Sequence, residues 1–194
     1  MRVSKETVAD HRKKILSAAS TMLRERGIEG ASVADLMQAA GLTHGGFYRH
    51  FPSKEALVVE ATTATFDALL ARLDAWSTEA GHAAALAKYV DSYLSPRHVE
   101  RPAIGCPIAA YGAEVGRENP QVRAAFNAGV DRLLNWIAGG LACADSERKE
   151  RAIELLALMV GAVVTARAVG EKSRVRAVLQ AARRRAEAIA TRRE

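Results

Sequence analysis

Apolar residues recur along this chain at intervals of three and four positions, which is the spacing of one face of an α-helix. The first run extends from Val8 to Leu23 and is followed by Gly27, a residue typical of helix ends. No segment alternates in the manner of a β-strand. The pattern therefore predicts an all-α protein of about nine helices, with later helices expected from Ser53 to about Gly81 and near residues 82–95, 106–117, 120–142, 146–169 and 172–191.

Two short helices and a tight turn are predicted between the first helix and the long one. Ser32 precedes an apolar stripe of about eight residues, and Asp35 forms a variant of the capping box with it. After the turn Gly-Leu-Thr, a third helix is expected from Thr43 through Phe51, where Phe47 and Phe51 share one face and can anchor it in the core. Two helices joined by a glycine-containing turn of this length are typical of a helix-turn-helix.

Glycines and hydrogen-bond donors are concentrated in this predicted third helix. Glycine lowers helix propensity by about 1 kcal/mol per site, so the pair Gly45 and Gly46 requires a reason, and close approach of DNA is one. Thr43 and His44 stand at the leading end, where side chains reach base edges in the major groove. The donors suited to phosphate oxygens follow: Tyr48, Arg49, His50 and Lys54. An isolated Tyr-x-His would more often fill surface between helices.

The run GIEGASVADLMQAAGLTHGGFYRHFPSKEAL resembles the N-terminal DNA-binding domain of the tetracycline-repressor (TetR) family of bacterial transcriptional regulators. The resemblance implies a DNA-binding domain over residues 1–53 and a ligand-binding and dimerisation domain over residues 54–194. It also implies which residues touch DNA: Ser32, Thr43, His44, Tyr48, His50 and Lys54. Gly46 departs from the family pattern, because that position often bears a side chain that reads bases.

The C-terminal region resembles the family's effector-binding domain more loosely. The segment IGCPIAAYGAEVG is similar to a subgroup of these regulators that carries a cysteine there. In the family, the middle helices enclose a ligand cavity, and the residues of this chain expected near it are Phe66, Tyr89, Tyr93, Cys106, Tyr111, Phe126 and Trp136. For any one of the aromatic residues, ordinary core packing is the alternative.

Cys106 is a candidate sensor thiol. Pro107 favours the first position of a helix, which places the thiol at or near the N-cap, where the helix dipole favours thiolate. The alternative is a small buried hydrophobic residue, an interpretation that suits Cys143 still better. Two cysteines are too few for a disulfide framework and lack zinc-ligand spacing, so no metal and no cofactor are assigned.

The helix predicted near 146–169 is apolar almost all round, which indicates burial on two sides. We expect a homodimer that buries one side of this helix and part of the last one, as the resemblance also implies. The interface residues expected are Leu156, Val160, Gly161, Val164, Val178, Leu179 and Ala182. Two recognition helices about 34 Å apart would require a near-palindromic operator.

Composition and charge restrict the remaining possibilities. With 49% hydrophobic and 26% charged residues, the chain is typical of a soluble globular protein. The net charge of +6 is uneven, with +2 over residues 1–60, −2 over 61–166 and +6 over 167–194, so bulk charge does not locate a nucleic-acid site. No signal peptide is found and the apolar run 155–166 is too short to cross a bilayer, so we expect no membrane partner and a cytoplasmic location.

The function predicted is a ligand-responsive transcriptional regulator, most simply a repressor, with a small-molecule effector of unknown identity. Two other classes are possible: an all-helical enzyme and an architectural DNA-binding protein without a ligand. No paired carboxylates, nucleophile-base arrangement or phosphate loop favours the enzyme. The large C-terminal region argues against the architectural protein.

Overall fold

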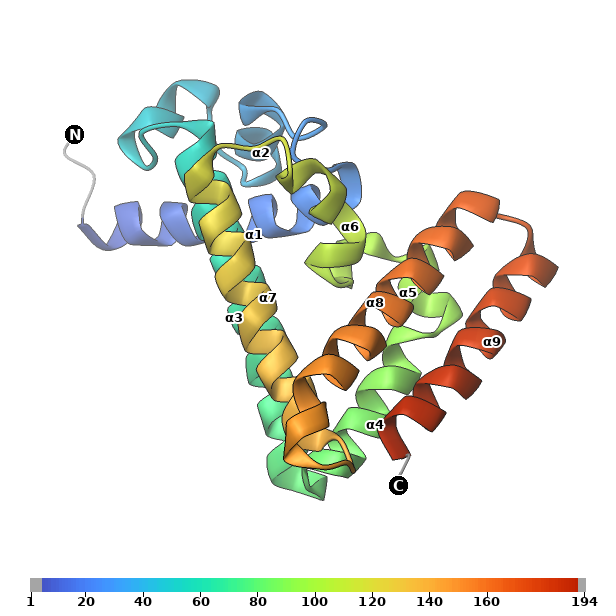
Figure 1. Ribbon diagram of the computed structural model, residues 1–194. Coiled ribbons are helices and arrows are strands. Elements are labelled where there is room, and N and C mark those ends of the chain that lie inside the picture. Colours follow the sequence, from blue (N-terminus) through green and yellow to red (C-terminus); the bar gives the residue numbers. More distant parts are fainter. Residues whose placement is uncertain (1–4, 192–194) are drawn as a thin grey trace.

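The computed structural model describes residues 5–191, and every regular element in that range is a helix (Figure 1). Nine α-helices and two 3-10 helices are present in this part of the chain. They are α1 (Lys5–Arg26), α2 (Val33–Ala39), η1 (His44–Arg49), α3 (Lys54–Ala80), α4 (His82–Tyr93), α5 (Pro96–Glu100), η2 (Pro102–Ile104), α6 (Pro107–Val115), α7 (Pro120–Gly140), α8 (Asp145–Val169) and α9 (Lys172–Thr191). The all-α fold predicted from the apolar spacing is confirmed.

The N-terminal unit consists of α1, α2 and η1. Ser32 is confirmed as the N-cap of α2, because the Asp35 backbone N–H donates to Ser32 Oγ at 3.1 Å. The Asp35 carboxylate accepts from the Ser32 hydroxyl at 2.6 Å, in place of the backbone N–H contact of a full capping box. Phe47 and Phe51 are fully buried, with ring centroids 5.9 Å apart. These two rings fix the helix-turn-helix to the core of the unit.

The third helix of this unit differs from the prediction. Residues 44–49 form a 3-10 helix rather than an α-helix through Phe51, and Thr43 makes no side-chain capping hydrogen bond to it. Two consecutive glycines remove helix propensity and Pro52 prevents continuation, so the segment is too short for a stable α-helix and takes the tighter form common in short pieces.

Helices α3 and α7 run side by side in the same direction, while α8 and α9 form an antiparallel pair beside them (Figure 1). Gly129 of α7 allows the first pair to approach closely, because a Cβ atom there would overlap ring carbons of the buried Phe66 of α3. One apolar cluster fills the N-terminal unit and reaches Phe66, Tyr111 and Phe126. A second apolar cluster joins α4, α7, α8 and α9.

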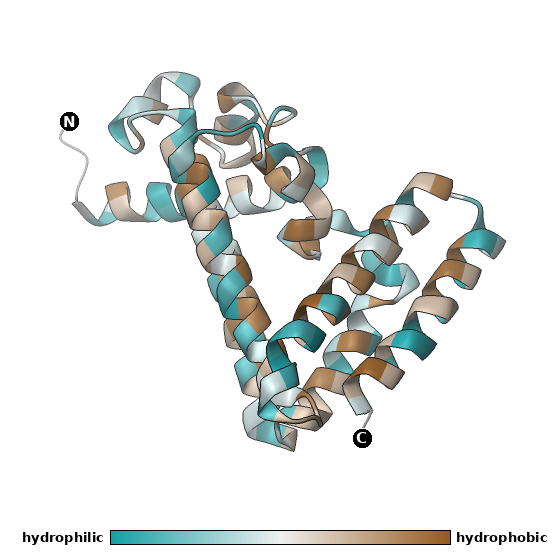
Figure 2. Ribbon diagram, in the orientation of Figure 1, coloured by the Kyte–Doolittle hydropathy of each residue, from teal (hydrophilic) through white to brown (hydrophobic). Residues whose placement is uncertain are grey.

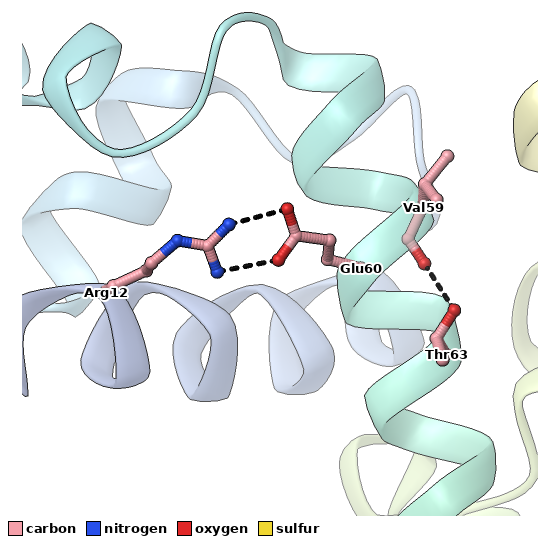
Figure 3. Close-up of polar contacts among 4 residues, drawn as sticks. All are labelled: Arg12, Val59, Glu60 and Thr63. Atoms are coloured by element: carbon pink, nitrogen blue, oxygen red, sulfur yellow. Dashed lines mark hydrogen bonds and ion pairs between the residues drawn. The ribbon is translucent and has the colours of Figure 1, made fainter. Parts of the chain in front are cut away.

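Polar contacts fasten the N-terminal unit to the long helix α3. The guanidinium of Arg12 on α1 forms a bidentate pair with the Glu60 carboxylate, with both N–O distances 2.7 Å (Figure 3). The same guanidinium lies 4.5 Å from the centroid of the Phe51 ring. The domain boundary predicted at 53/54 therefore falls between segments that share an apolar cluster and the Arg12–Glu60 ion pair. The predicted domains end outside the described residues at both termini.

A further contact ties the turn after α1 to α6. Gly27 ends α1 with a φ of +77°, a conformation that favours glycine. The Ile28 and Glu29 backbone N–H groups both donate to Glu114 Oε2, at 2.7 and 3.1 Å. On the other side of the same residue, Lys54 Nζ donates to the Ile28 carbonyl at 2.7 Å. The turn is thus held by α6 and by the start of α3 together.

Three of the predicted interface residues lie in the interior of the chain itself. Leu156, Leu179 and Ala182 are buried between α8 and α9 and their neighbours, so they cannot form a free surface. Helical spacing identified apolar faces correctly but could not tell which of them the chain covers with its own α9. Val160 and Val178 are half-buried, whereas Gly161 and Val164 are exposed.

Part of the exposed side of α8 is nevertheless apolar. It carries Ile153, Ala157, Gly161, Val164 and Ala168 at helical spacing, and the exposed fractions of Ile153 and Val164 are 48% and 47%. Figure 2 shows hydrophobic residues along most of α8 and an alternation of hydrophobic and hydrophilic ones along α9. The apolar run 155–166, predicted from sequence to be too short to cross a bilayer, belongs to the 25-residue helix α8. By length and composition alone this helix could cross a membrane, a property that core helices of soluble proteins share.

Candidate nucleic-acid interface and cavity

The predicted DNA-contacting residues gather on the outer side of α2 and η1. Ser32, Thr43, His44, Gly45, Tyr48 and Arg49 are exposed, and Gly46, His50 and Lys54 are half-buried. Tyr48 is 69% exposed, the largest value among the large hydrophobic side chains of the described residues. Its ring stands edge-on to that of the buried Phe47, with 5.3 Å between centroids, and leaves most of its surface in water, so its position favours contact with a partner.

The fold does not require glycine at either position 45 or position 46 of η1. Both have ordinary negative φ, a Cβ at Gly45 would meet no atom within 4 Å, and one at Gly46 would make only van der Waals contact with Met37, at 3.6 Å. Internal packing therefore does not explain the pair. A side chain at position 45 would extend into the space outside the protein, on the side from which a DNA backbone would approach.

A shallow groove of about 300 Å³ runs beside η1, and its walls include His11, Thr43, Arg49 and His50. The His50 Nδ1 atom is buried and has no hydrogen-bond partner among the described residues. Burial lowers the pKa of His50, and the nearby positive charges of His11, Arg49 and Arg12 lower it further. His11, on α1, was not found from sequence because nothing in its local pattern places it beside residue 50.

Two of the predicted contact residues also have structural tasks. Ser32 caps α2, and Lys54 donates to the Ile28 carbonyl at 2.7 Å. These bonds place the Ser32 hydroxyl and the Lys54 ammonium at the ends of helices that flank η1.

A separate cavity of about 230 Å³ lies among α3, α4, α5 and the loop that precedes α6. Of the residues predicted around a ligand, Tyr89, Tyr93 and Cys106 line it, together with Leu69, Arg72, Trp76, Ser92, Ser95, Arg97, His98, Ile104 and Gly105. Trp136 stands behind the wall, with its ring 5.8 Å from that of Tyr89. Arg72, Arg97 and His98 were not predicted, because Arg72 comes from α3, Arg97 and His98 come from the short α5, and the three share no motif.

The other three aromatic residues predicted there pack elsewhere. Phe66, Tyr111 and Phe126 belong to the apolar cluster shared with the N-terminal unit, with Phe126 5.6 Å from Phe66 and 5.9 Å from Tyr111 between ring centroids. None of them lines the cavity. For these three residues, core packing, the alternative considered from sequence, accounts for the position.

His98 fixes the shape of the cavity wall. Its Nε2 accepts a hydrogen bond from the Cys106 backbone N–H at 3.0 Å, so Nδ1 carries the proton and donates to the Tyr93 carbonyl at 2.8 Å. Burial lowers the pKa of His98 to about 4, and the positive charges of Arg167 and Arg72 contribute. The neutral ring thus joins the end of α4 to the start of α6.

Cys106 occupies the N-cap of α6, with Pro107 in the first turn, as predicted. Its electrostatics differ from the prediction, because the residue is only 4% exposed and burial raises the pKa of its thiol. The Ala109 and Ile108 N–H groups of the first turn lower this pKa, but the loss of water outweighs their effect. Within residues 5–191, no group of three or more His, Cys, Asp or Glu residues could hold a metal ion.

Comparisons with known proteins agree with this geometry. Residues 15–61 match the family model of bacterial regulatory proteins of the tetR family, and residues 83–182 match that of the tetracyclin repressor-like C-terminal domain. The chain is 38% identical over 64 residues to the HTH-type transcriptional repressor KstR2 of Mycolicibacterium smegmatis, which is 33% of this chain and 31% of that protein. The chain thus spans about a third of the length of such curated relatives.

Solved structures resemble the chain over nearly its whole length. The reduced form of E. coli NemR has a TM-score of 0.76 at 23% identity, covering 91% of this chain and 95% of that one. A TetR transcriptional regulator from Chloroflexus aurantiacus has a TM-score of 0.73 at 25% identity, covering 92% and 94%. The proteins matched are regulators and not enzymes. The second family model alone matches residues 83–182, which is more than half of this chain. The chain therefore belongs to the TetR family of bacterial transcriptional regulators.

Proposed function

We propose that this regulator is a cytoplasmic repressor that binds a near-palindromic operator as a homodimer and releases it when a small molecule occupies the cavity. The observation that carries the proposal is the outer surface of η1, which we call the recognition surface. It presents an exposed tyrosine, Tyr48, and two glycines that internal packing does not require, on a segment anchored by two buried phenylalanines. Such a surface suits a rigid partner that approaches the backbone closely.

Each contact residue has a proposed task. Thr43 and His44 read base edges from the leading end of η1, and Tyr48, Arg49 and His50 donate to phosphate oxygens. Lys54 reaches phosphate from the start of α3. Ser32 contacts the backbone beside the N-terminus of α2, where free N–H groups favour an anion.

Gly45→Leu is expected to weaken operator binding by about tenfold or more, because the new side chain holds the DNA backbone away. Stability should change by no more than about 0.5 kcal/mol, since a Cβ at this position meets no atom within 4 Å. Fluorescence anisotropy with labelled operator and thermal unfolding measure the two effects. Gly116→Leu, which also extends into open space but lies beyond α6, is the control. Unchanged operator affinity in the Gly45 variant would argue against close approach.

The exposed apolar stripe of α8 supports the homodimer. Ile153, Ala157, Gly161, Val164 and Ala168 form a strip of mostly small residues, which permits close approach of a second copy of the helix. A single chain that exposed this strip would leave apolar surface in water. The two-fold axis of the dimer would present two copies of η1 to successive major grooves, about 34 Å apart.

Val164→Glu should convert the dimer to a monomer at micromolar concentration, because a carboxylate would be buried against its own symmetry copy without a partner. Size-exclusion chromatography with light scattering measures the mass directly. Ala75→Glu, an exposed site on α3, adds the same charge elsewhere and should leave the dimer intact. A dimer that survives Val164→Glu places the interface on another surface.

Two connections support coupling between the cavity and the recognition surface. Helix α3 begins directly after η1 and supplies Leu69, Arg72 and Trp76 to the cavity wall, about 22 Å further along its axis. Helix α6 begins at Cys106 on the cavity wall, and its Glu114 holds the turn at Ile28. A ligand that binds one arrangement of these helices better than the other shifts the population of recognition-helix spacings.

The experiment that tests the proposed function is a titration of the dimer against DNA from upstream of its own gene and against scrambled DNA of equal length. Selective binding to the upstream DNA, lost on adding an effector, supports a ligand-responsive repressor. Binding without sequence preference, or binding that no occupant of the cavity alters, favours the architectural protein. Identical recognition-helix spacing in free and ligand-bound crystals would contradict the coupling.

Cys106 is a second candidate point of control, favoured by its place on the cavity wall. A small electrophile that enters the cavity would meet its sulfur, although the raised pKa slows the reaction at neutral pH. Iodoacetamide should release operator from the wild-type protein over hours and leave Cys106→Ser bound, as measured by anisotropy. Equal release from both proteins, or none from either, assigns Cys106 to packing.

A further inference from the structure

We propose that the cavity binds a small organic anion, a carboxylate attached to a single aromatic ring. The inference rests on the proposed ligand response and names the chemical class of the ligand. It follows from three properties of the lining: the sign of its charges, an unpartnered buried hydroxyl, and the size of the space.

The charge of the cavity has one sign. Its lining residues include the arginines Arg72 and Arg97 but no Asp or Glu. Both arginines are exposed, and the Arg72 guanidinium lies 5.5 Å from the centroid of the Trp76 ring. Planar guanidinium groups recognise carboxylates through paired hydrogen bonds. Two of them beside one opening favour an anion and disfavour a cation.

The exposed lining residues mark the mouth of the cavity and the buried ones its inner end. Ile104, 51% exposed, stands with the two arginines at the mouth, while Tyr89, Tyr93 and His98 are buried. A ligand would therefore place its carboxylate outward, beside the guanidinium groups. Its ring would extend inward against the tyrosine side chains and Leu69.

The inner end offers an unused hydrogen bond. Tyr89 is 3% exposed, and its hydroxyl, like that of the neighbouring Tyr93, has no hydrogen-bond partner among the described residues. A buried polar group without a partner costs free energy, so a ligand atom that accepts from it gains affinity. Burial raises the pKa of Tyr89 well above its ordinary value, so the hydroxyl remains a donor at every physiological pH. A hydroxyl or carbonyl oxygen at the far side of the ring would satisfy it.

The volume restricts the ligand to one ring. A cavity of about 150 Å³ accommodates benzene, whereas drug-sized ligands occupy about 300–1,000 Å³. At about 230 Å³, this cavity has room for one ring with small substituents.

The test uses 4-hydroxybenzoate, benzoate and 4-hydroxybenzamide as probes of the full-length dimer in isothermal titration calorimetry at pH 7.5. We expect 4-hydroxybenzoate to bind with a dissociation constant below about 1 mM and about tenfold more tightly than the neutral amide, as one charge-assisted contact provides. Benzoate lacks the ring hydroxyl that would meet Tyr89, so the wild-type protein should bind it more weakly than 4-hydroxybenzoate. The Tyr89→Phe variant should bind the two compounds with equal affinity.

Variants locate the anion. Arg72→Gln and Arg97→Gln should each weaken 4-hydroxybenzoate binding by about fivefold or more and leave the amide unaffected. Arg101→Gln removes an exposed arginine that does not line the cavity and should change binding by less than about twofold. Three results would overturn the proposal: equal affinity for the acid and the amide, equal effects of all three variants, or no binding of any probe. The last result is judged at a probe concentration of about 10 mM, roughly the weak limit of specific binding.

Operator binding, measured in parallel, separates this inference from the proposed function. If 4-hydroxybenzoate binds but operator stays bound, the ligand class holds and the ligand response fails. If operator binding is selective and no probe binds, the regulator stands and the ligand class is wrong.

Discussion

Replacing Gly129 with alanine is expected to lower the free energy of unfolding by about 3 kcal/mol. The new Cβ would overlap ring carbons of Phe66, including the one nearest the backbone, so the whole ring must move rather than its tip. Phe66 is fully buried and packs against Phe126, which leaves it no free space. Overpacking typically costs about 1–3 kcal/mol, and because the new Cβ overlaps several ring atoms we expect a cost of about 4 kcal/mol here. The higher helix propensity of alanine returns about 1 kcal/mol.

Thermal and urea unfolding measure this loss, which corresponds to a Tm lower by about 6–12 °C in a chain of this length. The matched control is Gly112→Ala on α6, whose Cβ would lie 3.4 Å from Phe126 in ordinary contact with the same cluster. It should be neutral or slightly stabilising. If both variants unfold at the wild-type temperature, α3 and α7 are not packed as closely as described here.

Acidification from pH 6.5 to pH 4 is expected to remove about 3 kcal/mol of stability through His98 alone. The pKa of His98 is lowered from 6.5 to about 4 in the folded protein, so the unfolded chain takes up a proton over this interval while the folded one does not. The stabilisation is complete above pH 6.5 and declines as the pH falls towards 4. A proton on Nε2 would also oppose the Cys106 N–H that now donates to it.

The measurement compares wild type and His98→Asn by urea unfolding at several pH values. The variant lacks this proton uptake, so the stability advantage of the wild type at pH 7 should shrink by about 3 kcal/mol as the pH reaches 4. Taking the difference between the proteins removes the contribution of the other titrating groups. A difference that is constant over this range would mean that His98 is not held as a neutral ring.

The sequence predicted the helices well where an apolar stripe is long, because burial of one face imposes a period. It missed α5 (Pro96–Glu100), whose five residues are too few to reveal a period and lie between the helices predicted near 82–95 and 106–117. It mistook η1 for an α-helix, because the spacing of Phe47 and Phe51 fits an α-turn while the glycines between them weaken one.

A candidate DNA-contacting surface could be proposed from sequence because its residues are contiguous, whereas the cavity brings together side chains from α3, α4, α5 and the segment before α6. An arginine such as Arg72 has the same local pattern as any solvated residue of a helix surface. Likewise, Leu179 and Val164 both lie on apolar stripes, and only the packing of α9 on α8 decides that one is interior and the other exposed.

The peptide groups around Ile28 set a condition for recombining regulators of this kind. Glu114 accepts from the N–H of Ile28, and Lys54 donates to its carbonyl, so both partners of this residue lie beyond residue 53. A chimera that grafts residues 1–53 onto the sensory half of another regulator would lose both partners unless the graft supplies equivalents. Compatible donors can therefore be chosen by asking for a carboxylate at the site of Glu114 and a cation at the site of Lys54, before any overall similarity is considered.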